Sequence, residues 1–351
     1  MKVSEEVFGK LKDGTQVHAY TLDNGNGMTV KVMDYGAAIL EIKVPAKEGT
    51  LDVLLGHESL KGYEDNGSAH GATVGRNANR IGNARFVLNG KNYELDKNDG
   101  KNNLHGGFQR WYERMWSVTE GEENEDASIT FSLLSPDMDQ GFPGTVDVSV
   151  TYTLTADNSL MIHYTGVPDQ DTIMNMTNHS YFNLEGHGAG SIRNHVAYIP
   201  SDYFTETDCE LIPTGKLIPV KGTPLDFNVP KPIGQDIDAD YEALRFGSGY
   251  DQNWVLDNHG ELELAATLYS PVSGIFMEVY TDLPGIQMYT GNFLNDAGKD
   301  GAIYTRNSGV ALETQYFPDA INHENFKQPV VKAGEEYDTT TVYKFSLKES
   351  D

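Results

Sequence analysis

The chain has 351 residues, of which 38% are apolar and 22% are charged, a balance typical of a folded globular protein rather than a disordered one. Its 26 basic and 52 acidic side chains give a net charge of −26, which makes nucleic acid and anionic membrane surfaces unfavourable partners. The single cysteine, Cys209, rules out an intrachain disulfide framework and a cysteine-based zinc site.

The first residues and the hydropathy give an expected location. Residues 1–14 lack the apolar segment of a signal peptide, and no window has the length and apolarity of a transmembrane helix. We therefore expect a soluble, cytoplasmic protein, or a secreted or periplasmic one if a signal peptide has been removed.

Apolar and polar residues alternate with period two along most of the chain, which predicts β-strands. Two short segments, 57–65 and 238–246, have helical patterns instead. In segment 85–95, Asn89-Gly90 separates two alternating arms, a pattern typical of a tight β-hairpin. In chain order, the other strands are expected at residues 28–36, 127–134, 146–155, 160–167, 274–280 and 340–347.

The chain shows no internal repeat, low-complexity tract or linker that would divide it. Its most acidic stretch, residues 120–126, fits a solvated hairpin loop better than a domain boundary. Many strands joined by short turns predict an all-β protein with a single domain over residues 1–351, a large antiparallel β-sandwich.

One carboxylate stands inside an apolar strand. In GVALETQYF (309–317), Glu313 shares a strand face with Ala311, Gln315 and Phe317. Burying an ionised carboxylate without partners is costly, so Glu313 needs a reason to be there. A functional role is the favoured interpretation.

Other reactive side chains gather in short polar segments. Each has a structural interpretation when taken alone: Arg80 as a surface ion pair, His105 as a loop histidine, and His179 as a satisfied core group. Tyr181 and Phe182 are expected to pack. The candidate residues are Asn79 and Arg80 in GRNANRI, His105 in NNLHGG, His179 in TNHSYF, Asp251 in GYDQN and Gln287 in PGIQMY.

Several catalytic motifs are missing. The ten histidines form neither HExxH nor HxH, and the chain has no GxSxG elbow, P-loop or dinucleotide fingerprint. What remains is histidine, carboxylate, arginine and amides, without a metal motif or an activated nucleophile. Such a set suits proton transfer on a neutral polyhydroxylated ligand.

The order and spacing of seven motifs resemble those of the aldose 1-epimerases. The resemblance implies a galactose mutarotase-like supersandwich with an open sugar cleft. It also implies interconversion of the α and β anomers of free aldoses such as galactose and glucose. No cofactor or metal is implied, the partner is a monosaccharide, and the chain is expected to be a monomer or homodimer. The motifs are GRNANRI, NNLHGG, GFPG, TNHSYFNL, YDQN, YTGNF and ALETQYFPDAINH.

By motif, the resemblance assigns Glu313 as the general base and His179 as the general acid. A histidine that acts as an acid must be cationic, so we expect its surroundings to raise its pKa. The resemblance assigns sugar binding to His105, Arg80 and Asp251, and further polar contacts to Asn79 and Gln287.

The chain departs from the family pattern at three positions. Gln252 stands where a histidine is frequent, and Ile321 and Glu324 replace common prolines. These changes affect substrate preference at most, because the acid and base positions are intact.

Three alternative functions stay open at this stage. A hexose-6-phosphate 1-epimerase would need a cluster of Arg and Lys for the phosphate. A glycosidase would use Glu313 and Asp251 as its two carboxylates, which leaves His179 without a purpose. A non-catalytic carbohydrate-binding protein would have no need for Glu313 in an apolar strand.

Overall fold

The predicted strands are present, with small shifts at their ends. The computed structural model describes residues 2–120 and 126–348. Val146–Leu154 (β13) and Ser159–Pro168 (β14) form the predicted antiparallel pair, with Leu154 opposite Leu160. Side chains along β13 alternate between buried and more exposed positions, as in a strand with one face toward the core.

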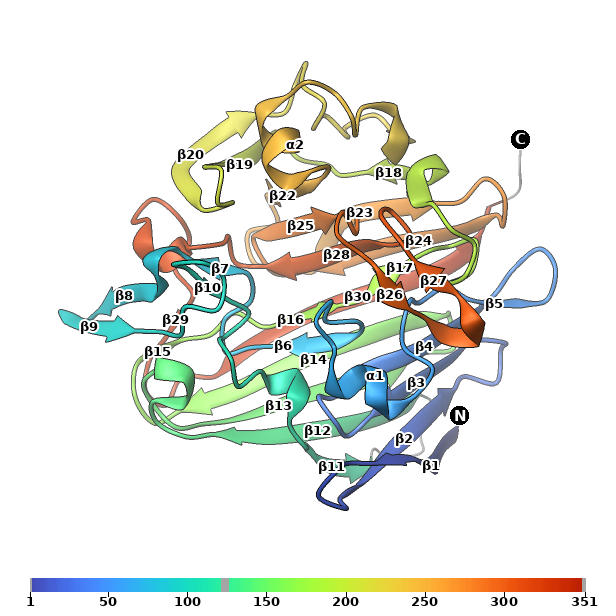
Figure 1. Ribbon diagram of the computed structural model, residues 1–351, viewed down its shortest axis with the longest axis horizontal. Helices are drawn as coiled ribbons and strands as arrows, with labels where there is room; N and C mark the ends of the chain where they lie inside the picture. Colours follow the sequence, from blue (N-terminus) through green and yellow to red (C-terminus); the bar gives the residue numbers. More distant parts are fainter. Residues whose placement is uncertain (1, 121–125, 349–351) are drawn as a thin grey trace.

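Three antiparallel sheets contain most of the strand residues of the described chain (Figure 1). The largest has nine strands among the described residues, and residues 121–125 of the predicted acidic loop lie outside them. In spatial order its strands are β11 (Ser117–Glu120), β12 (Ala127–Ser135), β13, β14, β30 (Tyr337–Leu347), β24 (Ile275–Thr281), β23 (Glu263–Tyr269), β18 (Val196–Tyr198) and β21 (Lys231–Pro232).

The second sheet carries the segment with Glu313. It has six strands in the described chain, and the third sheet, built from the N-terminal residues, has five. The six are, in order, β17 (Tyr181–Phe182), β28 (Val310–Gln315), β25 (Gly285–Tyr289), β22 (Asp251–Val255), β19 (Tyr203–Thr207) and β20 (Pro213–Pro219). The five are β1 (Lys2–Lys10), β2 (Gln16–Asp23), β3 (Thr29–Met33), β4 (Ala38–Pro45) and β5 (Thr50–Asp52).

Short two-stranded pairs connect and flank these sheets. The pairs are β6 (Ala72–Val74) with β16 (Thr177–His179), β7 (Arg80–Ile81) with β10 (Asn103–Leu104), β8 (Arg85–Leu88) with β9 (Lys91–Glu94), β15 (Thr172–Ile173) with β29 (Val330–Val331), and β26 (Asp296–Ala297) with β27 (Ile303–Tyr304).

The predicted hairpin at residues 85–95 is confirmed. Asn89 and Gly90 both have positive φ, 52° and 76°, between β8 and β9. A two-residue turn of this kind needs left-handed backbone at both positions, which Asn and Gly adopt most readily.

Both predicted helices form but are shorter than their patterns. They span Leu60–Glu64 (α1) and Glu242–Gly247 (α2). Ser59 and Tyr241, which precede them, have extended backbone, so the helical turns begin only after these residues. Among the described residues, no helix has the length and apolarity to cross a membrane.

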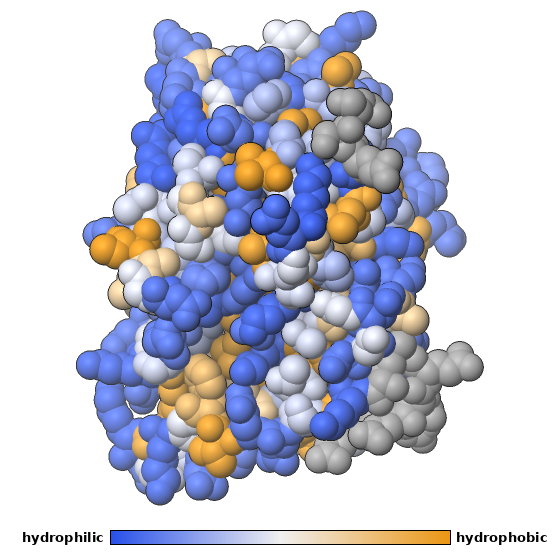
Figure 2. All heavy atoms as spheres, turned by 90° about the vertical axis from the view of Figure 1, so that its right-hand side faces the viewer, coloured by the Kyte–Doolittle hydropathy of each residue, from blue (hydrophilic) through white to orange (hydrophobic). Residues whose placement is uncertain are grey.

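A continuous apolar core joins the three sheets. Val30, Phe131, Met277 and Leu312 lie in it, from β3, β12, β24 and β28. The face seen in Figure 2 is mostly hydrophilic, with apolar side chains in small separate groups, as expected for a chain with this excess of acidic residues.

Candidate active site

Six of the seven predicted site residues line a cleft of about 340 Å³. They come from β7, β16, β22 and β28 and from the residues just before β7 and just after β10, segments that are distant in sequence and meet only in the folded chain. Glu313, His179, His105, Arg80, Asp251 and Asn79 all line the cleft.

Glu313 lies in the middle of β28, between β17 and β25. All six residues of this strand are buried, so the carboxylate cannot turn to bulk solvent. Only 3% of the Glu313 side chain is exposed, and its Oε2 has no hydrogen-bond partner among the described residues. The sequence-based inference of an unusual buried carboxylate is therefore confirmed.

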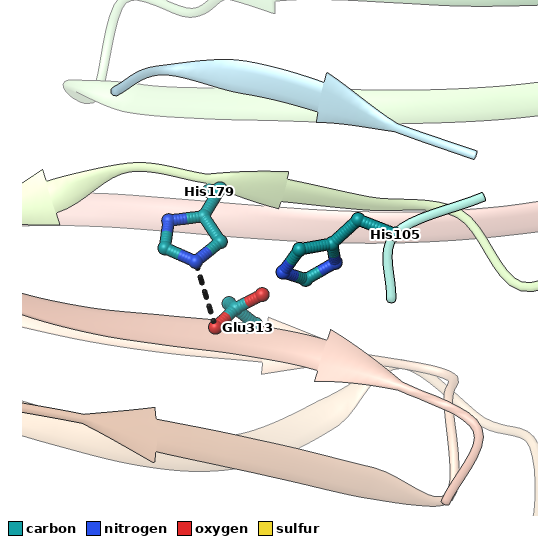
Figure 3. A group of neighbouring side chains, drawn as sticks. All are labelled: His105, His179 and Glu313. Atoms are coloured by element: carbon teal, nitrogen blue, oxygen red, sulfur yellow. Dashed lines mark ion pairs between the residues drawn. The ribbon is translucent and has the colours of Figure 1, made fainter. Parts of the chain in front are cut away.

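His179 ends β16 and faces Glu313 across the cleft (Figure 3). Its Nε2 lies 3.5 Å from Oε1 of Glu313, and within the described part of the chain its Nδ1 has no hydrogen-bond partner. Met176 and Phe182 of the same segment are in the apolar core, which confirms the expected packing of Phe182. The strand thus turns its polar side to the cleft.

Burial acts on both members of this pair. It raises the pKa of Glu313 to about 8, with a smaller contribution from the charge of Asp251 that Arg80 opposes. It also lowers the pKa of His179 to about 4. The expectation that the surroundings raise the pKa of His179 is wrong, because loss of solvent outweighs any attraction from nearby carboxylates.

His105 follows β10 and is held by Asn79, the residue before β7. Its backbone N–H donates to the carbonyl of Asn79 at 3.0 Å, and its Nδ1 accepts from the backbone N–H of Asn79 at 3.1 Å. The chain then turns sharply: a Cβ on Gly106 would lie 2.5 Å from the carbonyl oxygen of Gly75. This close approach explains why glycine follows the histidine.

Arg80 and Asp251 complete the polar lining. The Nε of Arg80 donates to Oδ2 of Asp99 at 2.8 Å. Oδ1 of Asp251 accepts from Nε2 of Gln287 at 2.7 Å, and burial raises the pKa of Asp251. Gln287 itself is not among the residues that line the cleft, and it acts on the site through its hydrogen bond to Asp251.

Gln252 takes part in the same support. Its Oε1 accepts from the backbone N–H of Asp251 at 3.0 Å, and its Nε2 donates to the carbonyl of Ala243 in α2 at 2.8 Å. The residue that replaces the family's frequent histidine therefore joins β22 to α2 and does not reach the cleft lining.

The sequence interpretation missed several cleft residues. Tyr181, expected to pack, lines the cleft with its ring centroid 4.9 Å from that of His179. Ser68, Arg110, Tyr289 and Phe293 also line it. The position of Phe293 within the quoted motif YTGNF was a signal for that residue, whereas the stretch around Ser68 carries no catalytic pattern.

The arrangement has two chemical capacities. A buried carboxyl and an imidazole in near contact can exchange protons with a ligand that lies in the cleft and contacts both of them. Ligand atoms of His105, His179 and Glu313 also lie within 4.8 Å of one another, and two imidazoles and a carboxylate form a donor set for divalent cations.

The site is thus a polar cleft in a β-supersandwich, with a buried carboxyl group and an imidazole side by side. A sequence model described as Aldose 1-epimerase matches residues 18–344. The chain therefore belongs to the aldose 1-epimerase family. The resemblance drawn from the motifs and the isomerase class that it implies are confirmed.

Individual relatives agree with this assignment over the full length. An aldose 1-epimerase of Haemophilus influenzae is 44% identical, covering 97% of this chain and 99% of that protein. Human galactose mutarotase is 38% identical, covering 98% and 99%. Galactose 1-epimerase from Lactobacillus acidophilus has a similar structure, with a TM-score of 0.88 at 26% identity over 99% of both chains.

Proposed function

We propose that this chain interconverts the α and β anomers of free aldoses, galactose and glucose among them, with Glu313 as base and His179 as acid. The observation that carries the proposal is the buried pair, 3.5 Å from Nε2 to Oε1, in the wall of a cleft of monosaccharide size. Its nearest neighbours in the cleft are polar groups suited to sugar hydroxyls.

The pair holds one proton near neutral pH. With a pKa of about 8 for Glu313 and about 4 for His179, that proton resides on the carboxyl group. The reactive form, ionised Glu313 with cationic His179, carries the same number of protons. A shift of one proton across the short gap thus converts the resting form to the reactive one without exchange with solvent.

The chemistry follows from this reactive form. Glu313 removes the proton from the anomeric hydroxyl, and a C1=O double bond forms as the C1–O5 bond breaks. His179 delivers its proton to O5, which gives the open-chain aldehyde and leaves a protonated Glu313 with a neutral His179. Rotation about C1–C2 and the reverse transfers then close the ring on the other face. No net proton is gained or lost, and the pair itself supplies both acid and base.

The surrounding residues hold the sugar. Arg80 and His105 donate hydrogen bonds toward sugar oxygens, and Asp251 accepts from hydroxyls, with Gln287 keeping its carboxylate in place. A rigid set of contacts of this kind orients C1 and O5 toward the pair. Asn79 lines the same wall.

The phosphosugar alternative has no support in the cleft. Among its described lining residues the guanidinium groups are those of Arg80 and Arg110, and each is already paired, with Asp99 and Glu113 respectively. A phosphate would therefore have to displace a carboxylate to bind. A non-catalytic sugar-binding protein would not need two buried titratable groups side by side, each with one polar atom that has no hydrogen-bond partner among the described residues.

Three further features belong to the proposal. The chain forms a single domain, supported by the continuous core across its three sheets. It works as a monomer or homodimer, because one chain supplies every residue of the cleft described above. It acts in the cytoplasm, which suits a protein with one exposed cysteine and no disulfide among its described residues.

Polarimetry of freshly dissolved α-D-galactose and α-D-glucose tests the proposal. We expect the wild-type protein to accelerate the approach to anomeric equilibrium for both sugars. Excess glucose 6-phosphate should leave the galactose rate unchanged. Wild-type protein that accelerates neither sugar, or that is inhibited strongly by the phosphate ester, would contradict the proposal.

A further inference from the structure

His105 and Asn79 hold each other through two backbone-anchored hydrogen bonds. The N–H of His105 donates to the carbonyl of Asn79, and the N–H of Asn79 donates to the ring Nδ1 of His105 at 3.1 Å. Both residues have left-handed backbone, with φ of 51° and 59°. The ring is therefore held at one nitrogen by a group that can only donate.

A backbone N–H has no lone pair to offer, so Nδ1 must present its own lone pair to Asn79. In a neutral imidazole the proton then lies on the other nitrogen. We propose that the Asn79 backbone fixes His105 as the neutral Nε2–H tautomer, which makes His105 a permanent hydrogen-bond donor to the sugar and Asn79 its positioning residue.

The conformation of Asn79 is itself secured. Its side-chain Oδ1 accepts from the backbone N–H of Arg80 at 2.8 Å, and β7 and β10 pair with Leu104 opposite Arg80. Asparagine adopts left-handed backbone more readily than most residues because its amide can bond locally. The side chain of Asn79 thus stabilises the backbone conformation in which the backbone N–H of Asn79 points at the His105 ring.

The proton-bearing end of the ring faces the reacting centre. Figure 3 shows His105 directed toward His179 and Glu313, and its ring centroid lies 5.5 Å from that of His179. On the proposed function, the Nε2–H stabilises negative charge that develops on the sugar oxygen during ring opening, as a fixed amide does in an oxyanion hole. Burial lowers the pKa of His105 well below its ordinary value, which keeps the ring neutral.

The same constraint disfavours metal binding by this cluster. To ligate a cation through Nε2, His105 would have to carry its proton on Nδ1, where it would meet the N–H of Asn79. The two imidazoles and the carboxylate therefore match a metal-ligand set in composition. The His105 imidazole, however, is held in the tautomer whose Nε2 carries a proton and cannot coordinate a cation.

The tautomer can be measured without any sugar. Protein with ¹⁵N-labelled histidine is observed by long-range ¹H–¹⁵N correlation, and the His105 signals are assigned by their loss in His105→Gln. We expect a protonated Nε2 and an unprotonated Nδ1, unchanged between pH 5 and 8. An Nδ1–H tautomer or an imidazolium in this range would overturn the inference, whatever the polarimetric result.

A matched pair of variants tests the consequence for catalysis. Gln places its amide N–H near the position of Nε2, whereas Asn places it near Nδ1, and Asn tolerates positive φ at least as well. We expect His105→Asn to lower kcat on the order of 10²-fold, as for a lost oxyanion donor. His105→Gln should keep roughly tenfold more activity than His105→Asn and the wild-type pH profile. Equal losses, or a missing limb in the profile of His105→Gln, would refute the donor role.

Discussion

Two histidine–carboxylate pairs lie on either side of Tyr181, whose ring centroid is 4.9 Å from that of His179 and 5.0 Å from that of His70. In the first pair, Nε2 of His179 is 3.5 Å from Oε1 of Glu313, whose Oε2 finds no hydrogen-bond partner in residues 2–120 and 126–348. In the second, Oδ2 of Asp296 accepts from His70 at 3.0 Å and from the hydroxyl of Ser68 at 2.6 Å.

The two carboxyl groups differ in their affinity for protons. Hydrogen bonds from His70 and Ser68 lower the pKa of Asp296, whereas burial raises that of Glu313 to about 8. A carboxylate with its lone pairs occupied is a stable anion that ties loops together. One that is buried and under-bonded keeps the basicity of a catalyst.

The largest effect is expected when Glu313 is changed. Glu313→Gln should lower the mutarotation rate by roughly 10²-fold or more, because it removes the proposed general base. Asp296→Asn is the matched control, since it neutralises the other carboxylate, and it should keep most of the activity. Comparable losses of activity in both variants would contradict a catalytic role that belongs to Glu313 and not to Asp296.

The same variant should be more stable than wild type at alkaline pH. The folded-state pKa of Glu313 is raised, so its contribution to stability is complete below the ordinary value of about 4.3 and is lost as pH rises toward about 8. The difference in Tm between Glu313→Gln and wild type should therefore grow from pH 5 to pH 8. A constant difference would show that Glu313 is ionised in the folded protein throughout.

The next largest effect is expected at His179, the proposed general acid. His179→Gln should lower kcat on the order of 10²-fold, because an amide donates a hydrogen bond but cannot release its proton. His163→Gln is the control, as His163 belongs to an exposed pair with Asp338. Steady-state polarimetry on α-D-galactose checks both. A variant at position 179 that retains wild-type kcat would transfer the acid role to another group.

A smaller effect is expected at the second pair. Asp296→Asn should destabilise the fold on the order of 1 kcal/mol, because two hydrogen bonds to a charged group are weakened. The pKa of Asp296 is lowered on folding, so its stabilisation is present above about 3.9 and is lost as pH falls through the folded-state value. Thermal melts at pH 7 and pH 3 should show the difference from wild type shrinking in acid. A difference that grows in acid would contradict this.

The smallest effect is expected at Gln252. A histidine there can also accept from the Asp251 N–H and donate to Ala243, so Gln252→His should change kcat/KM by no more than about threefold. Gln252→Ala removes both bonds and should raise KM more than it lowers kcat, since Asp251 then loses its support. A dominant loss of kcat in the alanine variant would place Gln252 in the chemistry itself.

Much of this structure can be predicted from local patterns. Alternation in β13 and β14 and the Asn89-Gly90 turn depend on neighbouring residues only, and they are present as expected. Glu313 could be singled out because a carboxylate in an apolar strand is anomalous whatever the strand pairs with. The motifs added the other predicted site residues through resemblance, but not Ser68, Arg110 or Tyr289 of the cleft lining.

What could not be predicted depends on long-range pairing and burial. Asp296 meets Ser68 and His70 across more than two hundred residues, and no local pattern links these segments. The predicted direction of the His179 pKa shift was wrong for the same reason. The acidic composition is visible in the sequence, but the burial that lowers this pKa is not. Tyr181 could not be told from a packing residue until β17 was placed beside β28.

The most direct test of the account is the pH dependence of kcat/KM for α-D-galactose in the wild-type protein between pH 4 and 9. A pair that holds one proton from about 4 to about 8 predicts a plateau through neutral pH and a decline above about 8. The upper limit of the plateau is the pKa of Glu313, which the charge of Asp251 raises and that of Arg80 lowers. His105 stays neutral over this range, because burial lowers its pKa. A decline centred near 6.5, the ordinary value for histidine, would show that His179 titrates as an independent cation and would contradict the account.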